Sequence, residues 1–160
     1  VAGNHCMWLG DLLREQWGLS SHHQGLAREL CGFKCFIRHG DGTAKRDVGY
    51  RLLKRIMKHP VNVFLYRMLS PDLGVPLANY MSGASRKYKE RDSRWDREYR
   101  EYGLGKLAEG YEILLMGHTH KPKLEKLEGK VLINLGDWMK HFTYCRLDEQ
   151  GPRLLAWPER

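Results

Sequence analysis

Three short segments of this chain carry histidine or asparagine beside glycine, each where a probable strand ends. They are Gly3-Asn4-His5, His39-Gly40-Asp41 and Gly117-His118-Thr119-His120. Imidazole nitrogens and amide oxygens ligate divalent metal ions, and the glycines let the backbone turn tightly beside an ion. His118 and His120 are two residues apart, so an extended backbone directs both imidazoles to one side, where each can serve one of two nearby ions. The pattern predicts metal-assisted chemistry at strand ends.

One histidine at a strand end is more often a hydrogen-bonded structural residue than a ligand, but three such segments in this order are more specific. The order resembles the calcineurin-like metallophosphoesterase superfamily, whose signature runs Asp-x-His, Gly-Asp-x-x-Asp, Gly-Asn-His-Asp/Glu, Gly-His-x and Gly-His-x-His. Only the last three elements occur here. The chain also opens on Val1-Ala2 without Met. We therefore expect it to be the C-terminal part of a larger protein, with the bridging aspartate and the other ligands upstream.

The resemblance implies a role for five residues. Asn4, His39 and His118 correspond to ligands of one ion, and His120 corresponds to a ligand of the other. His5 corresponds to the residue that contacts the scissile phosphate and can protonate the leaving group. The implied cofactors are two divalent metal ions, with Mn²⁺ inferred from the superfamily alone.

Two positions depart from that signature. Cys6 stands where an acidic residue usually orients the preceding histidine, and a neutral thiol is a weaker partner. Arg38 precedes His39 where a small or apolar residue is usual. Either departure can signal reduced activity, and the alternative for Cys6 is a small buried residue with no chemical role.

Further segments narrow the resemblance to the UDP-2,3-diacylglucosamine diphosphatase branch of lipid A synthesis. They include Asp47-Val48-Gly49-Tyr50-Arg51, Ser82-Gly83-Ala84-Ser85-Arg86-Lys87 and Asn134-Leu135-Gly136-Asp137-Trp138. The branch implies hydrolysis of a pyrophosphate bond, with release of UMP and a lipid monophosphate. Hydroxyl and cationic groups suit a charged head group, so the substrate-binding candidates are Asp47, Tyr50, Ser82, Arg86 and Lys87.

The residue pattern predicts an α/β fold, and the resemblance makes it a metallophosphoesterase β-sandwich flanked by helices, in its C-terminal portion. Helical spacing is expected over residues 7–17, 47–58, 61–69 and 77–102, with Pro60 as a break. A hairpin is expected over residues 26–38, and five strands over residues 111–157 are expected to form a sheet. We assign residues 1–44 and 108–160 to the core and 45–107 to a helical cap.

The cap carries more apolar residues than a small surface hairpin needs. They can line a chamber for acyl chains, or they can pack against the sheet as core: Leu52, Leu53, Ile56, Val63, Phe64, Leu65 and Met68. Residues 84–102 hold seven Lys or Arg against five Asp or Glu, which favours a solvated helix face over a nucleic-acid arm.

Composition bounds the remaining possibilities. The 160 residues are 42% hydrophobic and 29% charged, which suits one globular domain. Four cysteines without a Cys-x-x-Cys pair are too few for a disulfide scaffold, so reduced thiols and a cytoplasmic location are expected. The net charge of +8 predicts an anionic partner: a phosphorylated glycolipid, with peripheral contact at the inner face of the cell membrane.

The sequence is compatible with three functions. The first is a metal-dependent pyrophosphohydrolase of a nucleotide-linked lipid. The second is a general phosphoesterase of the same fold, acting on substrates without acyl chains. The third is a truncated, non-catalytic module, because two closely spaced cations repel strongly without a bridging carboxylate.

Overall fold

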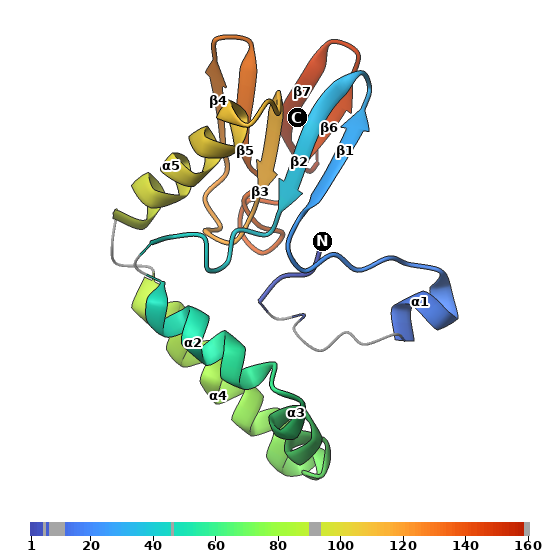
Figure 1. The fold of residues 1–160 in the computed structure, drawn as a ribbon, viewed down its shortest axis with the longest axis vertical. Helices are drawn as coiled ribbons and strands as arrows, with labels where there is room; N and C mark the ends of the chain where they lie inside the picture. Colours follow the sequence, from blue (N-terminus) through green and yellow to red (C-terminus); the bar gives the residue numbers. More distant parts are fainter. Residues whose placement is uncertain (5, 7–11, 46, 90–93, 159–160) are drawn as a thin grey trace.

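The computed structural model describes residues 1–4, 6, 12–45, 47–89 and 94–158, with backbone only for residues 12, 81–89, 94 and 95. Its helices and strands occur in blocks along the chain, with four consecutive helices between the second and third strands (Figure 1). The order is α1 (Leu12–Trp17), β1 (Leu26–Leu30), β2 (Phe33–Arg38), α2 (Val48–Met57), α3 (Pro60–Arg67), α4 (Pro71–Lys89), α5 (Arg94–Ala108), β3 (Ile113–Met116), β4 (Lys123–Leu127), β5 (Lys130–Asn134), β6 (Thr143–Asp148) and β7 (Gly151–Ala156).

The strands form two sheets. Five of them lie in the order β1-β2-β3-β5-β4, with β2, β3 and β5 parallel, while β6 and β7 pair antiparallel in a second sheet. The predicted hairpin over residues 26–38 is confirmed, and its turn residues Cys31 and Gly32 both have positive φ, as a tight two-residue hairpin turn requires. The expectation that the last five strands form one sheet is wrong: β3, β4 and β5 join β1 and β2, and β6–β7 stands apart.

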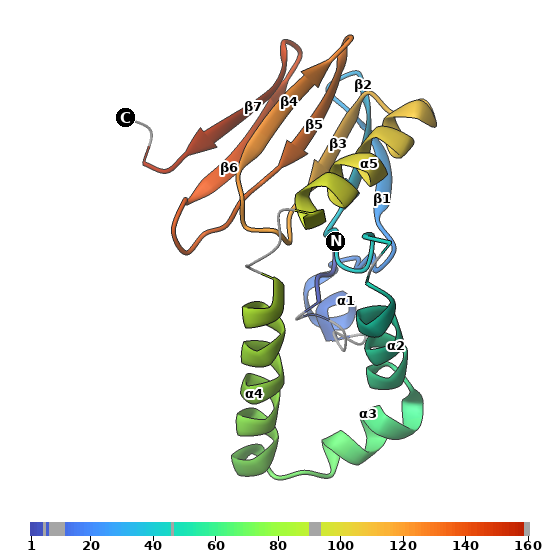
Figure 2. The same ribbon diagram turned by 90° about the vertical axis from the view of Figure 1, so that its left-hand side faces the viewer.

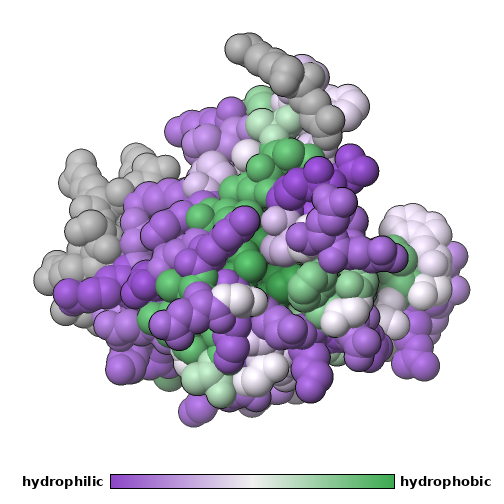
Figure 3. Space-filling view, turned by 90° about the horizontal axis from the view of Figure 1, so that it is seen from above, coloured by the Kyte–Doolittle hydropathy of each residue, from purple (hydrophilic) through white to green (hydrophobic). Residues whose placement is uncertain are grey.

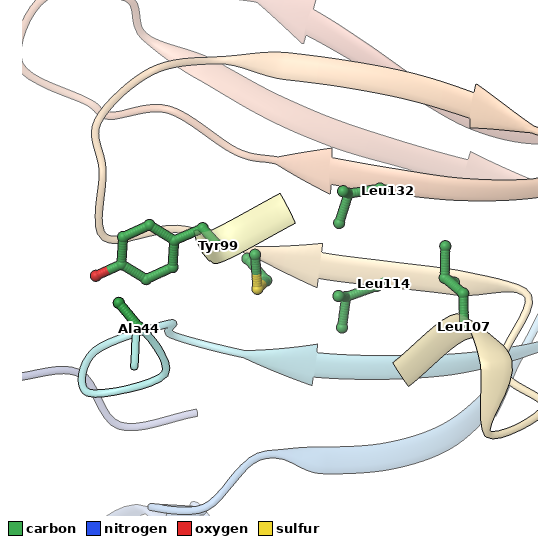
Figure 4. Packing of buried hydrophobic residues seen from close by; sticks show 6 residues of the cluster. Ala44, Tyr99, Leu107, Leu114 and Leu132 are labelled. Carbon is green, nitrogen blue, oxygen red and sulfur yellow. The ribbon is translucent and has the colours of Figure 1, made fainter. Parts of the chain in front are cut away.

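Alternation along β3 builds the two halves of the core. Leu114 and Met116 face α5 and pack with its Tyr99 and Leu107 (Figure 4). Ile113 and Leu115 face the other way, in a cluster that includes side chains of β6 and β7. A helix, a mixed sheet and a second sheet therefore lie in three layers, and the predicted α/β class with a sandwich of two sheets is confirmed.

Helices α2, α3 and α4 extend away from the sheets as an arm (Figures 1 and 2). The break at Pro60 is confirmed, and Pro60 begins α3 because the first helical position needs no backbone N–H donor. Asp47 is the N-cap residue of α2, as predicted, but its side chain makes no capping hydrogen bond. The described residues of the range 77–102 are helical, as expected, and belong to α4 and α5.

The arm leaves most of its apolar side chains in contact with solvent. Those expected to line a chamber or a core are exposed at six of seven positions, Leu52, Leu53, Ile56, Phe64, Leu65 and Met68, with Val63 half-buried. Helix α5 differs, since it packs on the sheet although it belongs largely to the predicted cap range 45–107. The division into core and cap stays a prediction.

The opposite end of the molecule also has an apolar feature. Seen from the end away from the arm, a strip of apolar side chains runs between polar ones (Figure 3).

Among the described residues, no helix is long and apolar enough to cross a membrane.

Candidate functional site

Two parallel strands deliver the central histidines to one edge of the sheet. Arg38 and Met116 are paired at the ends of β2 and β3, so His39 and Gly117 follow side by side. The Gly117 amide donates to the His39 carbonyl over 3.1 Å. The carboxyl ends of parallel strands are where open α/β sheets usually bind ligands.

The three predicted segments meet at this edge. The rings of His39 and His118 lie edge to face, with centroids 5.0 Å apart. Gly3, which precedes Asn4, packs so closely that a Cβ added to it would lie 2.7 Å from Nε2 of His39. The structure therefore brings the Gly3–Asn4 segment, His39 and His118 together.

His120 departs from the expected geometry. The backbone between the two histidines is not extended, because His118 and His120 both have left-handed φ values of 71° and 57°. His118 is half-buried, whereas His120 is exposed. The assumption of an extended backbone for this pair is therefore wrong, and the ligand role of His120 stays a prediction.

Asp41 is the most connected side chain of the site. Its Oδ1 lies 3.0 Å from Nδ1 of His39, and its Oδ2 accepts from the Tyr50 hydroxyl over 2.9 Å and from the Lys54 ammonium. The residue is only 5% exposed. Burial opposes its ionisation, but the hydrogen bonds from His39, Lys54 and Tyr50 hold the pKa of the Asp41 carboxyl well below its usual range.

The substrate-binding candidates divide into three groups. Asp47 is buried, at 3% exposure, beside the start of α2. The Tyr50 hydroxyl donates a hydrogen bond to Asp41, and burial together with the Asp41 charge raises the pKa of the Tyr50 hydroxyl. The side chains of Ser82, Arg86 and Lys87 and the whole of His5 lie outside the described residues.

Tyr99 of α5 covers the site from the other side. The centroids of its ring and the His118 ring are 5.9 Å apart, and Tyr99 is 4% exposed. Its buried hydroxyl has no hydrogen-bond partner among the described residues, and burial and the charges of Asp47 and Asp41 raise its pKa. A cavity of about 210 Å³ adjoins this position, lined among others by Tyr99, Thr119 and Asn134.

Three residues near this edge of the sheet have no role predicted from the sequence. Asp41 and Asn134 lie within the motifs that carry the resemblance, and Lys54 is predicted only to be part of a helix. Asn134 ends β5 and donates to the Thr119 hydroxyl over 2.6 Å and to the Gly117 carbonyl over 3.3 Å, so it holds the loop after β3. The motif Asn134-Leu135-Gly136, which contributes to the resemblance, is the sequence feature that could have indicated a role for Asn134.

The two departures from the signature have different surroundings. Arg38 donates to the Tyr102 hydroxyl over 2.9 Å, and its guanidinium lies over the Tyr102 ring, so this side chain ties β2 to α5. Cys6 is half-buried, and its amide donates to the Gly3 carbonyl over 3.0 Å, which closes the turn around Asn4.

The side chains at this edge are of types that bind metal ions, but few of them are grouped together among the described residues. Two converging imidazoles are ligands that zinc and other first-row divalent metals accept. Among the described residues, however, no three His, Cys, Asp or Glu side chains are grouped to hold an ion.

Comparisons with known proteins bear on the chemistry. No family model matches the chain. A UDP-2,3-diacylglucosamine hydrolase of Pseudomonas fluorescens (strain SBW25) is 31% identical over 160 residues, which cover 96% of this chain and 64% of that protein. The chain is related to the UDP-2,3-diacylglucosamine hydrolases. Proteins of that name from Pseudomonas putida KT2440 and Stutzerimonas stutzeri A1501 are 28% and 30% identical over 95% and 93% of this chain.

The match does not extend over the whole of these hydrolases. The chain spans 64% to 66% of the length of these relatives. Among solved structures, a Zn²⁺ complex of Vps29 from Entamoeba histolytica has a TM-score of 0.34 and 13% sequence identity, covering 74% of this chain and 38% of that one. Similarity at that level adds nothing to the assignment.

Proposed function

We propose that this chain belongs to a metal-dependent hydrolase that cleaves the pyrophosphate bond of UDP-2,3-diacylglucosamine, giving UMP and a lipid monophosphate. The observation that carries the proposal is the meeting of the Gly3–Asn4, His39–Gly40 and Gly117–His118 segments at the carboxyl ends of parallel strands. The names of the relatives support the choice of substrate.

The proposed roles follow the resemblance to the metallophosphoesterases. Asn4, His39 and His118 hold one divalent ion, His120 contributes to a second, and His5 contacts the phosphate. Bound ions of this kind activate a water and neutralise charge on the phosphoryl group, and Mn²⁺ is the proposed metal.

The arm formed by α2, α3 and α4 is the proposed site for the acyl chains. Its exposed apolar residues need cover, and Lys54 and Tyr50 of α2 lie at its junction with the site. Residues 45–107 form the proposed cap, within which α5 packs on the sheet and leaves α2 to α4 to receive substrate. Asp47, Tyr50, Ser82, Arg86 and Lys87 are the proposed contacts to the head group.

The test is turnover of the full-length protein on the UDP-linked lipid with Mn²⁺. His39→Ala or His118→Ala should lower turnover at least ~100-fold, because loss of a ligand disturbs the metal and its bound water. The matched control is His141→Ala, a histidine held by Asp137 outside the site, which should keep near-normal turnover. Near-normal turnover in His39→Ala and His118→Ala would exclude the site.

Two further measurements separate the alternatives. Hydrolysis of a cyclic nucleotide at a rate similar to that of the lipid would favour a general phosphoesterase. Elemental analysis of the 160-residue chain after exposure to Mn²⁺ tests the metal centre directly. About two ions per chain would support a working dinuclear site. One ion or none would mean that this chain supplies only part of that site.

A further inference from the structure

We propose that Asp41 is a positioning residue that fixes the ring of His39 and joins it to helix α2. The proposal concerns the geometry of the chain itself. It rests on the proposed function only where Nε2 of His39 is taken to bind a metal ion. Nothing in the order of residues assigns this role, since Asp41 is two positions from His39 and 13 positions from Lys54.

The first step concerns the proton on His39. The Lys54 ammonium and the Tyr50 hydroxyl both donate to Oδ2 of Asp41. A cation in direct contact stabilises the ionised carboxylate, which can only accept. Nδ1 of His39, 3.0 Å from Oδ1, must therefore carry a hydrogen. In the neutral ring this leaves the lone pair on Nε2, the nitrogen that a metal ligand needs.

The second step concerns where that nitrogen points. Nε2 and Cδ2 of His39 are the atoms that a Cβ on Gly3 would meet, both at 2.7 Å. The free nitrogen thus faces the segment that carries Asn4. Carboxylates that hold the far nitrogen of a metal-binding histidine fix both its tautomer and its ring orientation, and their loss commonly weakens metal binding ~10–100-fold.

The third step concerns helix α2. Tyr50 and Lys54 lie four residues apart on one face of α2, and both bond to Oδ2 of the same carboxylate. Asp41 uses one oxygen for the histidine and the other for the helix. The arm and the candidate ligand therefore share one buried anchor, and a movement of α2 at this point displaces the ring of His39.

The experiment is long-range ¹H–¹⁵N correlation NMR of the imidazoles in the metal-free chain. Wild-type His39 should be protonated on Nδ1, and Asp41→Ala should shift it to a mixture of the two tautomers. His141 supplies an internal control, because its Nδ1 lies 2.7 Å from Oδ2 of Asp137. Its signals should stay unchanged in Asp41→Ala and change in Asp137→Ala.

The same samples test the link to the helix. Amide hydrogen exchange of α2 should accelerate roughly tenfold or more in Asp41→Ala, since two hydrogen bonds to a charged group are lost, while exchange in α5 stays as in the wild type. Tyr50→Phe should give part of this effect. Mn²⁺ affinity should fall ~10–100-fold in Asp41→Ala and stay unchanged in Asp137→Ala.

Several outcomes overturn the proposal. An unprotonated Nδ1 in wild-type His39 refutes it without any variant. An unchanged tautomer in Asp41→Ala does the same. If that variant fails to fold, Asp41→Asn replaces it, because an amide offers one accepting oxygen to three donors and must lose a contact. A chain that binds no Mn²⁺ contradicts the proposed function and leaves the NMR test of Asp41 intact.

Discussion

At the residue scale, the site depends on contacts that leave no space for added atoms. Gly3 does not have a left-handed φ, and its lack of a side chain matters because the His39 ring occupies that space. Asp137 is a second example: it accepts from the amides of Met139 and Lys140 over 2.8 and 2.6 Å and from the His141 ring. One small residue and one buried carboxylate thus shape two loops.

Gly3→Ala should displace His39. The new methyl would lie 2.7 Å from two ring atoms, and overpacking of this kind costs about 1–3 kcal/mol. We expect a lower midpoint of thermal unfolding and weaker Mn²⁺ binding. Gly105→Ala is the control, because a Cβ there meets no atom within 4 Å; equal behaviour of the two variants would contradict the close contact.

Asp137 should make stability depend on pH in the acid range. Backbone and His141 hydrogen bonds hold the pKa of its carboxyl below the usual value, so its contribution is present above about pH 4, the range of an unfolded aspartate, and is lost as the pH falls. The difference in urea midpoint between wild type and Asp137→Asn should therefore be large at pH 7 and shrink below pH 4. A difference that is constant with pH would reject this role.

At the element scale, the helices between β2 and β3 are of two kinds. Helix α5 packs on the sheet through Tyr99 and Leu107, and Gly103 allows the close approach, since a Cβ there would lie 2.7 Å from Leu132. Helices α2 and α3 bury no residue fully. Parallel strands β2 and β3 require a long crossover, and α5 is the part of it that covers the sheet.

Gly103 and Gly105 of α5 form a matched pair for this contact. Gly105→Ala should stabilise the chain by up to about 1 kcal/mol, because alanine favours a helix and space is open there. Gly103→Ala should lose this gain and destabilise by about 1–3 kcal/mol through contact with Leu132 and Leu114. Urea unfolding measures both values. Equal stabilisation by the two substitutions would mean that α5 lies farther from the sheet.

At the scale of the whole molecule, charge and exposed apolar surface occur together. The chain has a net charge of +8, and the arm exposes large side chains such as Phe64 and Met68. Basic groups beside apolar ones suit the surface of an anionic bilayer, where the charge attracts and the apolar groups insert.

Vesicle sedimentation tests this surface. The chain should bind vesicles that contain an anionic phospholipid, and 1 M salt should weaken binding because the Debye length falls from about 10 Å at 0.1 M to about 3 Å. Phe64→Ser with Met68→Ser should reduce binding further without loss of fold, since both side chains are exposed. Equal binding to neutral vesicles would exclude the role of charge.

Much of this protein follows from local sequence. The hairpin turn at Cys31-Gly32, the break at Pro60 and the strand ends before His39 and His118 are all set by residues close in the chain, so periodicity and turn residues predict them. The meeting of the three glycine-containing segments was expected from the resemblance to the metallophosphoesterases, which makes Asn4, His39 and His118 ligands of one ion.

Tertiary structure alone decided the rest. The second sheet depends on which faces of β3 and β5 are covered by α5, and the left-handed backbone of His118 and His120 depends on the loop held by Asn134. Asp41 is the clearest case, since its partners His39, Tyr50 and Lys54 come from a strand end and a helix. Hydrogen bonds between side chains depend on distance in space, and a pattern of residue types along the chain does not determine that distance.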